Sequence, residues 1–188
     1  MTRMTTGLQG SANAEQDRAQ FAVSRPVKWN ASTRSMVRRV LARHDGSTIS
    51  LLESLTDSVV ALSIKEHRTV RHANDVAVLQ VTREAPVLRR RVELTIRRRV
   101  VVRATAAVAL DRLPHDFVSA LARKTMALGE LIRRHRLDTY REPGDCRLNL
   151  GDGVLTRTYR ILHRDLPVAQ VTEHFLLAAL EDACAAAD

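Results

Sequence analysis

The sequence predicts an α+β fold, in which an antiparallel β-sheet is flanked by helices. Two pairs of β-rich runs, each joined by a short polar connection, predict two β-hairpins. Amphipathic helical patterns lie toward both ends of the chain, where helices could cover one face of a sheet. With 188 residues, the chain has the length of one such domain and can bury a substantial core.

The N-terminal segment differs in composition from the rest of the chain. Residues 1–25 are rich in small and polar residues and carry too few large aliphatic side chains to offset the entropy of ordering. We expect a disordered tail there and a single domain over residues 26–188. The chain shows neither a signal-peptide core nor a run of about 18 uncharged apolar residues, so we expect a cytoplasmic protein with no membrane partner.

Helical spacing dominates the first part of the predicted domain. Apolar residues recur with a helical period over residues 33–46, directly after Ser32, and the pattern ends at a glycine that could serve as a C-cap. Ser47 and Thr48 could cap a short second helix. The β-branched run 58–66 then predicts the first strand.

The middle of the chain holds the first predicted hairpin. Its strands cover residues 87–96 and 100–110, and the connection Arg97-Arg98-Arg99 is typical of a solvated turn. Residues 113–136 show helical spacing and predict two short helices. A loop that contains Pro143-Gly144 is expected to follow.

The last third of the chain holds the second predicted hairpin. Its strands cover residues 155–163 and 166–175, and a short polar connection joins them. Alanine and leucine dominate residues 177–187, which predict a C-terminal helix. Strands joined by such short turns must be antiparallel neighbours, which completes the α+β prediction.

Three charged residues share a strand face with apolar residues. Side chains along a strand alternate between the two faces of a sheet, so Arg90 lies in a leucine and valine row while Arg89 and Arg91 point the other way. The same alternation puts Glu173 and Arg157 in apolar rows of the second hairpin. A buried guanidinium needs a carboxylate or a bound anion to offset its desolvation. Several ionisable groups in a small core usually mark a site.

A simpler interpretation is that Arg90 and Glu173 pair with each other inside the core. The net charge of +9 would attract either a small anion or a polyanion. Aromatic residues make up only 3% of the chain, which gives no platform for base stacking, so no nucleic-acid partner is expected. The two cysteines and the histidines show no ligand spacing, so neither a disulfide framework nor a metal site is expected.

Four segments of the chain together resemble a known family. They are LRRRVEL around Arg90, ALDRLP followed by ALGELI, RTYRI from Arg157, and PVAQVTEHFL around Glu173. In order and spacing they resemble the chorismate-pyruvate lyase family, particularly its actinobacterial branch that forms 4-hydroxybenzoate. The resemblance covers residues 32–180.

The resemblance implies an internal ligand pocket beneath helical flaps and a cofactor-independent lyase that converts chorismate to 4-hydroxybenzoate and pyruvate. By carry-over, Arg90 and Glu173 would be the catalytic residues. Arg90 would bind the ring carboxylate and Glu173 would meet the 4-hydroxyl group. The backbone amide of Leu128, beside Gly129, would add a hydrogen bond.

The enolpyruvyl carboxylate of such a substrate would need a cation of its own, because a dianion in a dry pocket calls for more than one donor. Arg157 and Lys65 are the candidates. Two features depart from the family pattern. The segment Ser47-Thr48-Ile49-Ser50 lacks the basic residue that often follows a threonine there, and the turn at Arg97-Arg98-Arg99 replaces a glycine-containing hairpin.

Two other functions fit the same pattern. The chain could be an enzyme of this fold recruited to another pericyclic or elimination reaction in specialised metabolism, in which Arg90 and Glu173 grip a different acid. It could also be a ligand-sensing module like the effector domains of bacterial repressors. Those carry a winged helix-turn-helix upstream, and the polar residues before Ser32 are not expected to form one. The oligomeric state does not follow from the sequence.

Overall fold

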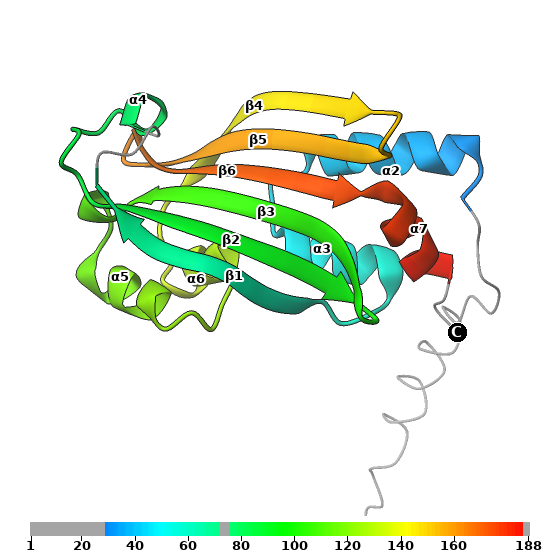
Figure 1. The fold of residues 1–188 in the computed structure, drawn as a ribbon, viewed down its shortest axis with the longest axis horizontal. Helices are drawn as coiled ribbons and strands as arrows, with labels where there is room; N and C mark the ends of the chain where they lie inside the picture. Colours follow the sequence, from blue (N-terminus) through cyan, green and yellow to red (C-terminus); the bar gives the residue numbers. More distant parts are fainter. Residues whose placement is uncertain (1–28, 72–75, 186–188) are drawn as a thin grey trace, which may run out of the picture.

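The computed structural model describes residues 29–71 and 76–185 of the chain. They form one six-stranded antiparallel sheet with helices packed mainly against one of its faces (Figure 1), which confirms the predicted α+β class. The predicted disordered tail over residues 1–25 lies outside the described residues.

The sheet has the strand order β1-β2-β3-β6-β5-β4. Each neighbouring pair is antiparallel, and the central pair β3 and β6 joins the two predicted hairpins. The strands are β1 (Ala61–Val70), β2 (Val87–Ile96), β3 (Arg99–Ala109), β4 (Tyr140–Asn149), β5 (Val154–His163) and β6 (Leu166–Leu176).

The helices pack their apolar sides onto the sheet in two groups. One core cluster lies beneath the first two helices and the C-terminal helix, around Phe175 and Leu52. A second cluster lies beneath the middle pair, around Phe117 and Leu131. The helical elements are α2 (Ala31–Arg43), α3 (Thr48–Thr56), α4 (Val76–Leu79), the 3-10 helix η1 (Leu110–Arg112), α5 (His115–Ala122), α6 (Leu128–Arg134) and α7 (Leu177–Ala185).

Side-chain caps set the starts of the first two helices. Asn30, rather than Ser32, caps α2, and its side chain accepts a hydrogen bond of 2.8 Å from the amide of Thr33. Ser47 caps α3 as predicted, with its hydroxyl accepting from the amide of Ser50. The Ser47 cap fixes the start of α3 and therefore the place of Thr48 as its first residue.

The edge strand β4 was expected to be a loop, and this expectation was wrong. Pro143 and Gly144 fall where the pairing with β5 shifts register between Pro143 and Cys146. Proline and glycine are tolerated at such irregularities and at sheet edges, where a missing ladder bond costs little. The pair Pro143-Gly144, which suggested a turn, therefore marks a bulge inside β4.

Both hairpins turn through residues with positive φ. Arg97 and Arg98 have φ of 47° and 67°, and Arg164 and Asp165 have φ of 50° and 61°. Two successive left-handed residues match the twist of antiparallel strands. The first predicted connection is thus a two-residue turn, because Arg99 already belongs to β3.

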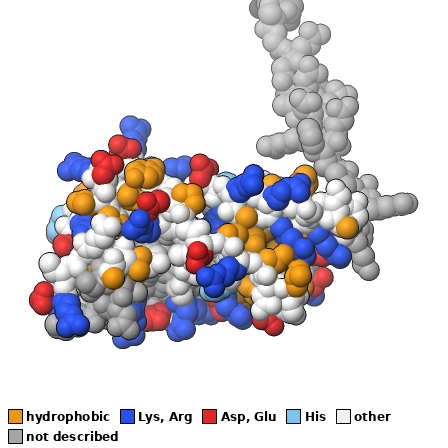
Figure 2. Space-filling model, turned by 90° about the horizontal axis from the view of Figure 1, so that it is seen from above, with side chains coloured by type: hydrophobic (Ala, Val, Ile, Leu, Met, Phe, Trp, Pro, Cys, Tyr) orange, Lys and Arg blue, Asp and Glu red, His pale blue; other side chains and the backbone are white. Residues whose placement is uncertain are grey.

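Charged side chains of both signs cover the surface. On the face seen in Figure 2, lysine and arginine side chains are interspersed with acidic ones, and hydrophobic side chains show between them. No helix within the described ranges is long and apolar enough to cross a membrane.

Candidate functional site

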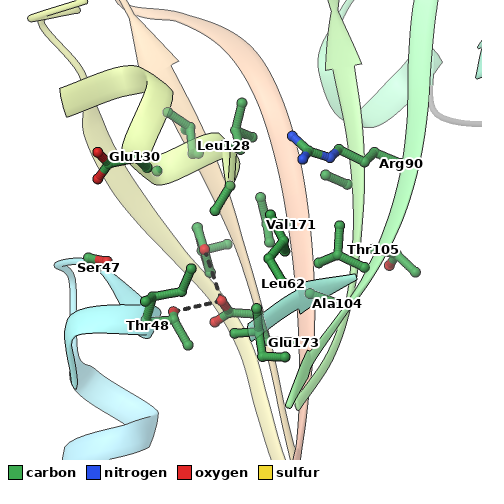
Figure 3. A pocket seen from close by; sticks show the side chains of 18 of the residues that line it. Ser47, Thr48, Leu62, Arg90, Ala104, Thr105, Leu128, Glu130, Val171 and Glu173 are labelled. Carbon is green, nitrogen blue, oxygen red and sulfur yellow. Dashed lines mark hydrogen bonds between the residues drawn. The ribbon is translucent and has the colours of Figure 1, made fainter. Parts of the chain in front are cut away.

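A cavity lies between the helix-covered face of the sheet and the first residues of α3 and α6. The space not filled by atoms there is about 670 Å³, a volume that includes open solvent at the mouth. Arg90 and Glu173 line it on opposite sides (Figure 3). The lining also includes Thr48, Ala104, Ala106, Leu128, Gly129, Glu130, Arg141 and Tyr159.

Small residues on β3 leave room in the middle of the sheet. Ala106 lies opposite Arg90 on β2, and Ala104 lies opposite Glu173 on β6. Both alanines line the cavity. Because an alanine fills so little of the inward face, the two charged side chains border on free space instead of packed apolar groups.

Arg90 is a buried guanidinium that lacks a carboxylate partner within the described part of the chain. The residue is 4% exposed. Its Nη2 donates to the backbone carbonyl of Met126, in the linker between α5 and α6, whereas Nε and Nη1 are buried without a hydrogen-bond partner. Burial lowers the pKa of Arg90 from its usual value. A cation in this condition is costly unless an anion joins it.

Glu173 is equally buried but fully partnered. Its Oε2 accepts a hydrogen bond of 2.6 Å from Nε of Arg157, which lies directly opposite on β5. Its Oε1 accepts one of 2.7 Å from the Thr48 hydroxyl. The Arg157 guanidinium also donates to the carbonyls of Leu41 and His44 at the end of α2 and to the Thr48 hydroxyl at the start of α3, so it ties both helices to the sheet.

Tyr159 completes the polar end of the cavity. Its hydroxyl donates to Oε1 of Glu173 at 3.5 Å. Burial, together with the nearby charge of Glu173, raises the pKa of Tyr159 far above its usual value, so the phenol stays neutral and remains a donor. Two guanidinium groups lie near its ring, with Cζ of Arg141 at 4.8 Å and Cζ of Arg157 at 5.4 Å from the centroid.

The structure brings four of the six predicted site residues to the cavity wall. Arg90, Leu128, Gly129 and Glu173 line it. Arg90 and Glu173 do not pair with each other, because Glu173 is bound to Arg157. The simpler interpretation of a mutual core pair is therefore not what the structure shows.

Arg157 and Lys65 take other places. Arg157 supports Glu173 from behind and is not part of the lining. Lys65 lies where the pairing of β1 with β2 shifts register between Ile64 and Glu66. The preceding Ile64 pairs with Val92, which lines the cavity, so alternation along β1 turns Lys65 to the other face of the sheet. Lys65 is 46% exposed and pairs at 3.2 Å with Glu93, whose row on β2 faces away from the cavity.

Sequence reasoning overlooked three contributors to the site. Thr48 was predicted to cap a helix and not to contact a ligand, and Tyr159 stood only within the RTYRI segment of the family resemblance. Arg141 was hidden in the segment expected to be a loop, although it lies on β4 and lines the cavity. Its place as the second residue of that strand had no local signal, because the proline and glycine that follow suggested a turn.

No group of three or more His, Cys, Asp or Glu side chains in the described ranges could hold a metal ion. The polar groups of the lining include instead the guanidinium groups of Arg90 and Arg141, the carboxylates of Glu173 and Glu130, and neutral hydroxyls. Such a set suits a small organic acid with a hydroxyl at its far end.

Fold and site together define the class: an α+β domain with a cavity whose wall carries two guanidinium groups and a buried carboxylate. The protein family described as Chorismate pyruvate-lyase Rv2949c-like matches residues 43–183. The chain belongs to this family, which confirms the resemblance inferred from the sequence.

Curated relatives carry the same description. Chorismate pyruvate-lyase from Mycobacterium tuberculosis is 26% identical, and the match covers 77% of this chain and 82% of the relative. The protein of the same name from Mycobacterium bovis matches with the same values.

Two solved structures of one mycobacterial protein share the fold. PhnF from Mycobacterium smegmatis superposes with a TM-score of 0.55 at 15% identity, covering 87% of this chain and 93% of PhnF. The effector domain of PhnF gives a TM-score of 0.52 at 16% identity, covering 70% of this chain and 88% of that domain. At these identities the likeness shows the fold alone.

Proposed function

We propose that the protein is a lyase that converts chorismate to 4-hydroxybenzoate and pyruvate in this cavity, without a cofactor and in the cytoplasm. The observation that carries the proposal is the open guanidinium of Arg90, which is 4% exposed and has two nitrogen atoms without partners among the described residues. Membership of the chorismate pyruvate-lyase family supports the same reaction.

Arg90 would bind the ring carboxylate. The donors on Nε and Nη1 have no partner among the described residues and point to different edges of the guanidinium plane. A carboxylate would accept from one of them together with the second hydrogen of the neighbouring Nη2, as a planar guanidinium allows. Leu128 is the first residue of α6, and the first amides of a helix have no partner within it. Its backbone amide would add a hydrogen bond to the same carboxylate, beside the compact backbone of Gly129.

Glu173 would contact the 4-hydroxyl group at the opposite end. Its carboxylate is held from behind by Arg157 and from the side by Thr48, so its orientation is fixed before the ligand arrives. Arg157 is a positioning residue in this scheme, because it acts through Glu173. Fixing both ends of a rigid ring reduces the entropy lost in reaching the reactive geometry.

The reaction requires little further chemistry from the protein. The bond between ring carbon 3 and the ether oxygen breaks, and the ring loses one hydrogen from carbon 4 while the enolpyruvyl methylene gains one. Substrate atoms therefore divide completely between 4-hydroxybenzoate and pyruvate, with no water consumed. Aromatisation of the ring supplies the driving force, so holding the substrate in the reactive conformation can account for much of the catalysis.

The test is release of pyruvate from chorismate by the purified full chain. We expect pyruvate and 4-hydroxybenzoate in equal amounts, with kcat/KM lowered on the order of 100- to 1,000-fold in Arg90→Met, because a buried charge contact is lost. Glu173→Gln should also lower the rate. Arg91→Met is the matched control, since Arg91 lies on the same strand and faces away, paired at 3.5 Å with Glu66.

The other outcomes separate the alternatives. Folded wild-type protein that binds chorismate or 4-hydroxybenzoate and releases no pyruvate would exclude the lyase and favour a sensing role. Turnover of a different acid, again dependent on Arg90, would point to a recruited enzyme of the same fold.

A further inference from the structure

A second guanidinium lines the same cavity and has no part in the proposed binding of the ring. Arg141 stands on the edge strand β4, at the wall that also includes Gly129 and Tyr159. The proposed substrate carries two carboxylates, and Arg90 can bind only one of them. A role for Arg141 in holding the second carboxylate rests on the proposed function, because it depends on the identity of that substrate.

Two contacts hold the Arg141 side chain in place without neutralising it. Nη1 donates to the backbone carbonyl of Gly46, just before α3. Cζ lies 4.8 Å from the centroid of the Tyr159 ring, within the range of a cation–π contact. Nη2 lies 3.6 Å from the position that a Cβ on Gly129 would occupy, so the helix α6 approaches it closely.

No carboxylate in the described ranges forms an ion pair with Arg141. The adjacent Glu142 pairs with Arg160 instead. Glu130 also lines the cavity, but its carboxylate pairs with Arg133 and Arg134. The positive charge of Arg141 is therefore still available to a ligand.

Other cations near the cavity are already occupied. Arg157 is bound to Glu173 at 2.6 Å, and Lys65 is bound to Glu93 at 3.2 Å. Among the described residues that line the cavity, Arg90 and Arg141 are the cations. They come from β2 and β4, the second and the last strand in the sheet order, so they reach the ligand from separate sides.

We propose that Arg141 binds the enolpyruvyl carboxylate, while Arg90 binds the ring carboxylate. The ring carboxylate is common to chorismate and 4-hydroxybenzoate, whereas the enolpyruvyl carboxylate leaves with pyruvate. Arg141 thus contributes to binding only while the ether bond is intact, and it lets the site distinguish substrate from product. Binding of both carboxylates also fixes the orientation of the enolpyruvyl group relative to the ring, and this is the group that must be cleaved.

The experiment compares a dicarboxylate with a monocarboxylate. In Arg141→Met, kcat/KM for chorismate should fall about 10- to 100-fold, the loss expected for one charge-assisted hydrogen-bonded contact. The Kd for 4-hydroxybenzoate should stay within about 2-fold of wild type. Arg141→Lys should recover part of the loss. In Arg90→Met, by contrast, affinity for both ligands should fall.

The matched control is Arg147→Met, on the same strand, where Arg147 is 81% exposed and pairs with Asp145. It should leave every readout unchanged. Equal losses for chorismate and 4-hydroxybenzoate in both Arg141 variants would overturn the assignment, and so would an unchanged kcat/KM. Thermal unfolding checks that each variant is folded.

Pyruvate release tests the proposed function, and equilibrium binding tests the role of Arg141 independently of it. If wild type releases no pyruvate, the lyase proposal fails, and equilibrium binding still tests Arg141. The assignment then predicts that Arg141→Met weakens chorismate but not 4-hydroxybenzoate. Unchanged affinity for both ligands, or an equal loss of affinity for both, would overturn the assignment.

Discussion

Arg157 and Arg90 are both 4% exposed, and both project from the inward face of the same sheet, yet their surroundings are opposite. Arg157 donates to a carboxylate, a hydroxyl and two backbone carbonyls. Arg90 donates to one carbonyl and keeps two buried nitrogens without partners in the described structure.

The difference separates two uses of a buried arginine. A guanidinium whose donors are all taken by the protein stabilises the fold and orients its partner. A guanidinium left open beside a cavity weakens the fold unless an anion from outside completes it. The same residue type at the same depth therefore supports Glu173 in one place and receives a ligand in the other.

The largest effect on stability is expected when the buried ion pair of Arg157 with Glu173 is broken. Arg157→Met leaves Glu173 buried without its counter-charge and removes donors from two carbonyls, so the free energy of unfolding should fall by about 3–5 kcal/mol. Denaturant unfolding measures it. The double variant Arg157→Met/Glu173→Leu should recover most of the loss, because no charge is then left unpaired. A single variant within about 1 kcal/mol of wild type would contradict the structural role.

A change in stability of the opposite sign is expected when the unpaired Arg90 is replaced. Arg90→Met removes a buried charge with no counter-ion, so without ligand the protein should be as stable as wild type or more stable by up to about 2 kcal/mol. The same unfolding experiment measures this difference. A loss as large as that of Arg157→Met would show that Arg90 is structural.

A smaller effect on stability is expected at Tyr159, which lines the cavity and also contacts Glu173. Tyr159→Phe removes one long hydrogen bond of 3.5 Å to Glu173, while Arg157 and Thr48 still hold the carboxylate. The free energy of unfolding should fall by no more than about 1 kcal/mol. Unfolding curves of the two proteins, run side by side, provide the comparison. A loss of several kcal/mol would mean that the phenol, and not Arg157, anchors Glu173.

The smallest effect is a change in titration. His67 lies opposite Arg90 on β1, and burial, together with the charges of Arg90 and Lys124, lowers its pKa from 6.5. The unfolded chain then binds the proton more readily, so stability is lost as pH falls through and below 6.5. Arg90→Met removes one cause and should raise the pKa of His67. Histidine NMR titration measures it, and an unchanged value would place Arg90 too far away to act.

The alternation of side chains along a strand was enough to predict that Arg90, Arg157 and Glu173 face inward. It could not predict which of them pair. Inward rows of the second hairpin consist of odd-numbered residues on both strands, whereas its turn pairs His163 with Leu166. Only the register shift between Ile161 and Leu162 brings Arg157 opposite Glu173.

The remaining failures have different causes. Lys65 follows Ile64, which pairs with the cavity-lining Val92, so alternation along β1 turns Lys65 away from the cavity. An irregularity after Pro143 concealed a strand and with it Arg141. Bulges depend on pairing between strands, so a single stretch of sequence carries little sign of them. Resemblance to the family identified Arg90, Glu173 and the Leu128-Gly129 segment, but not the support behind Glu173.

The central claim is that Arg90 is held open for the carboxylate of a small organic acid. The most direct measurement is the Kd of 4-hydroxybenzoate for wild type, Arg90→Met and the control Arg91→Met, each shown to be folded. We predict binding by wild type and the control, and affinity lowered at least about 30-fold in Arg90→Met. Equal affinity in all three proteins would contradict the claim.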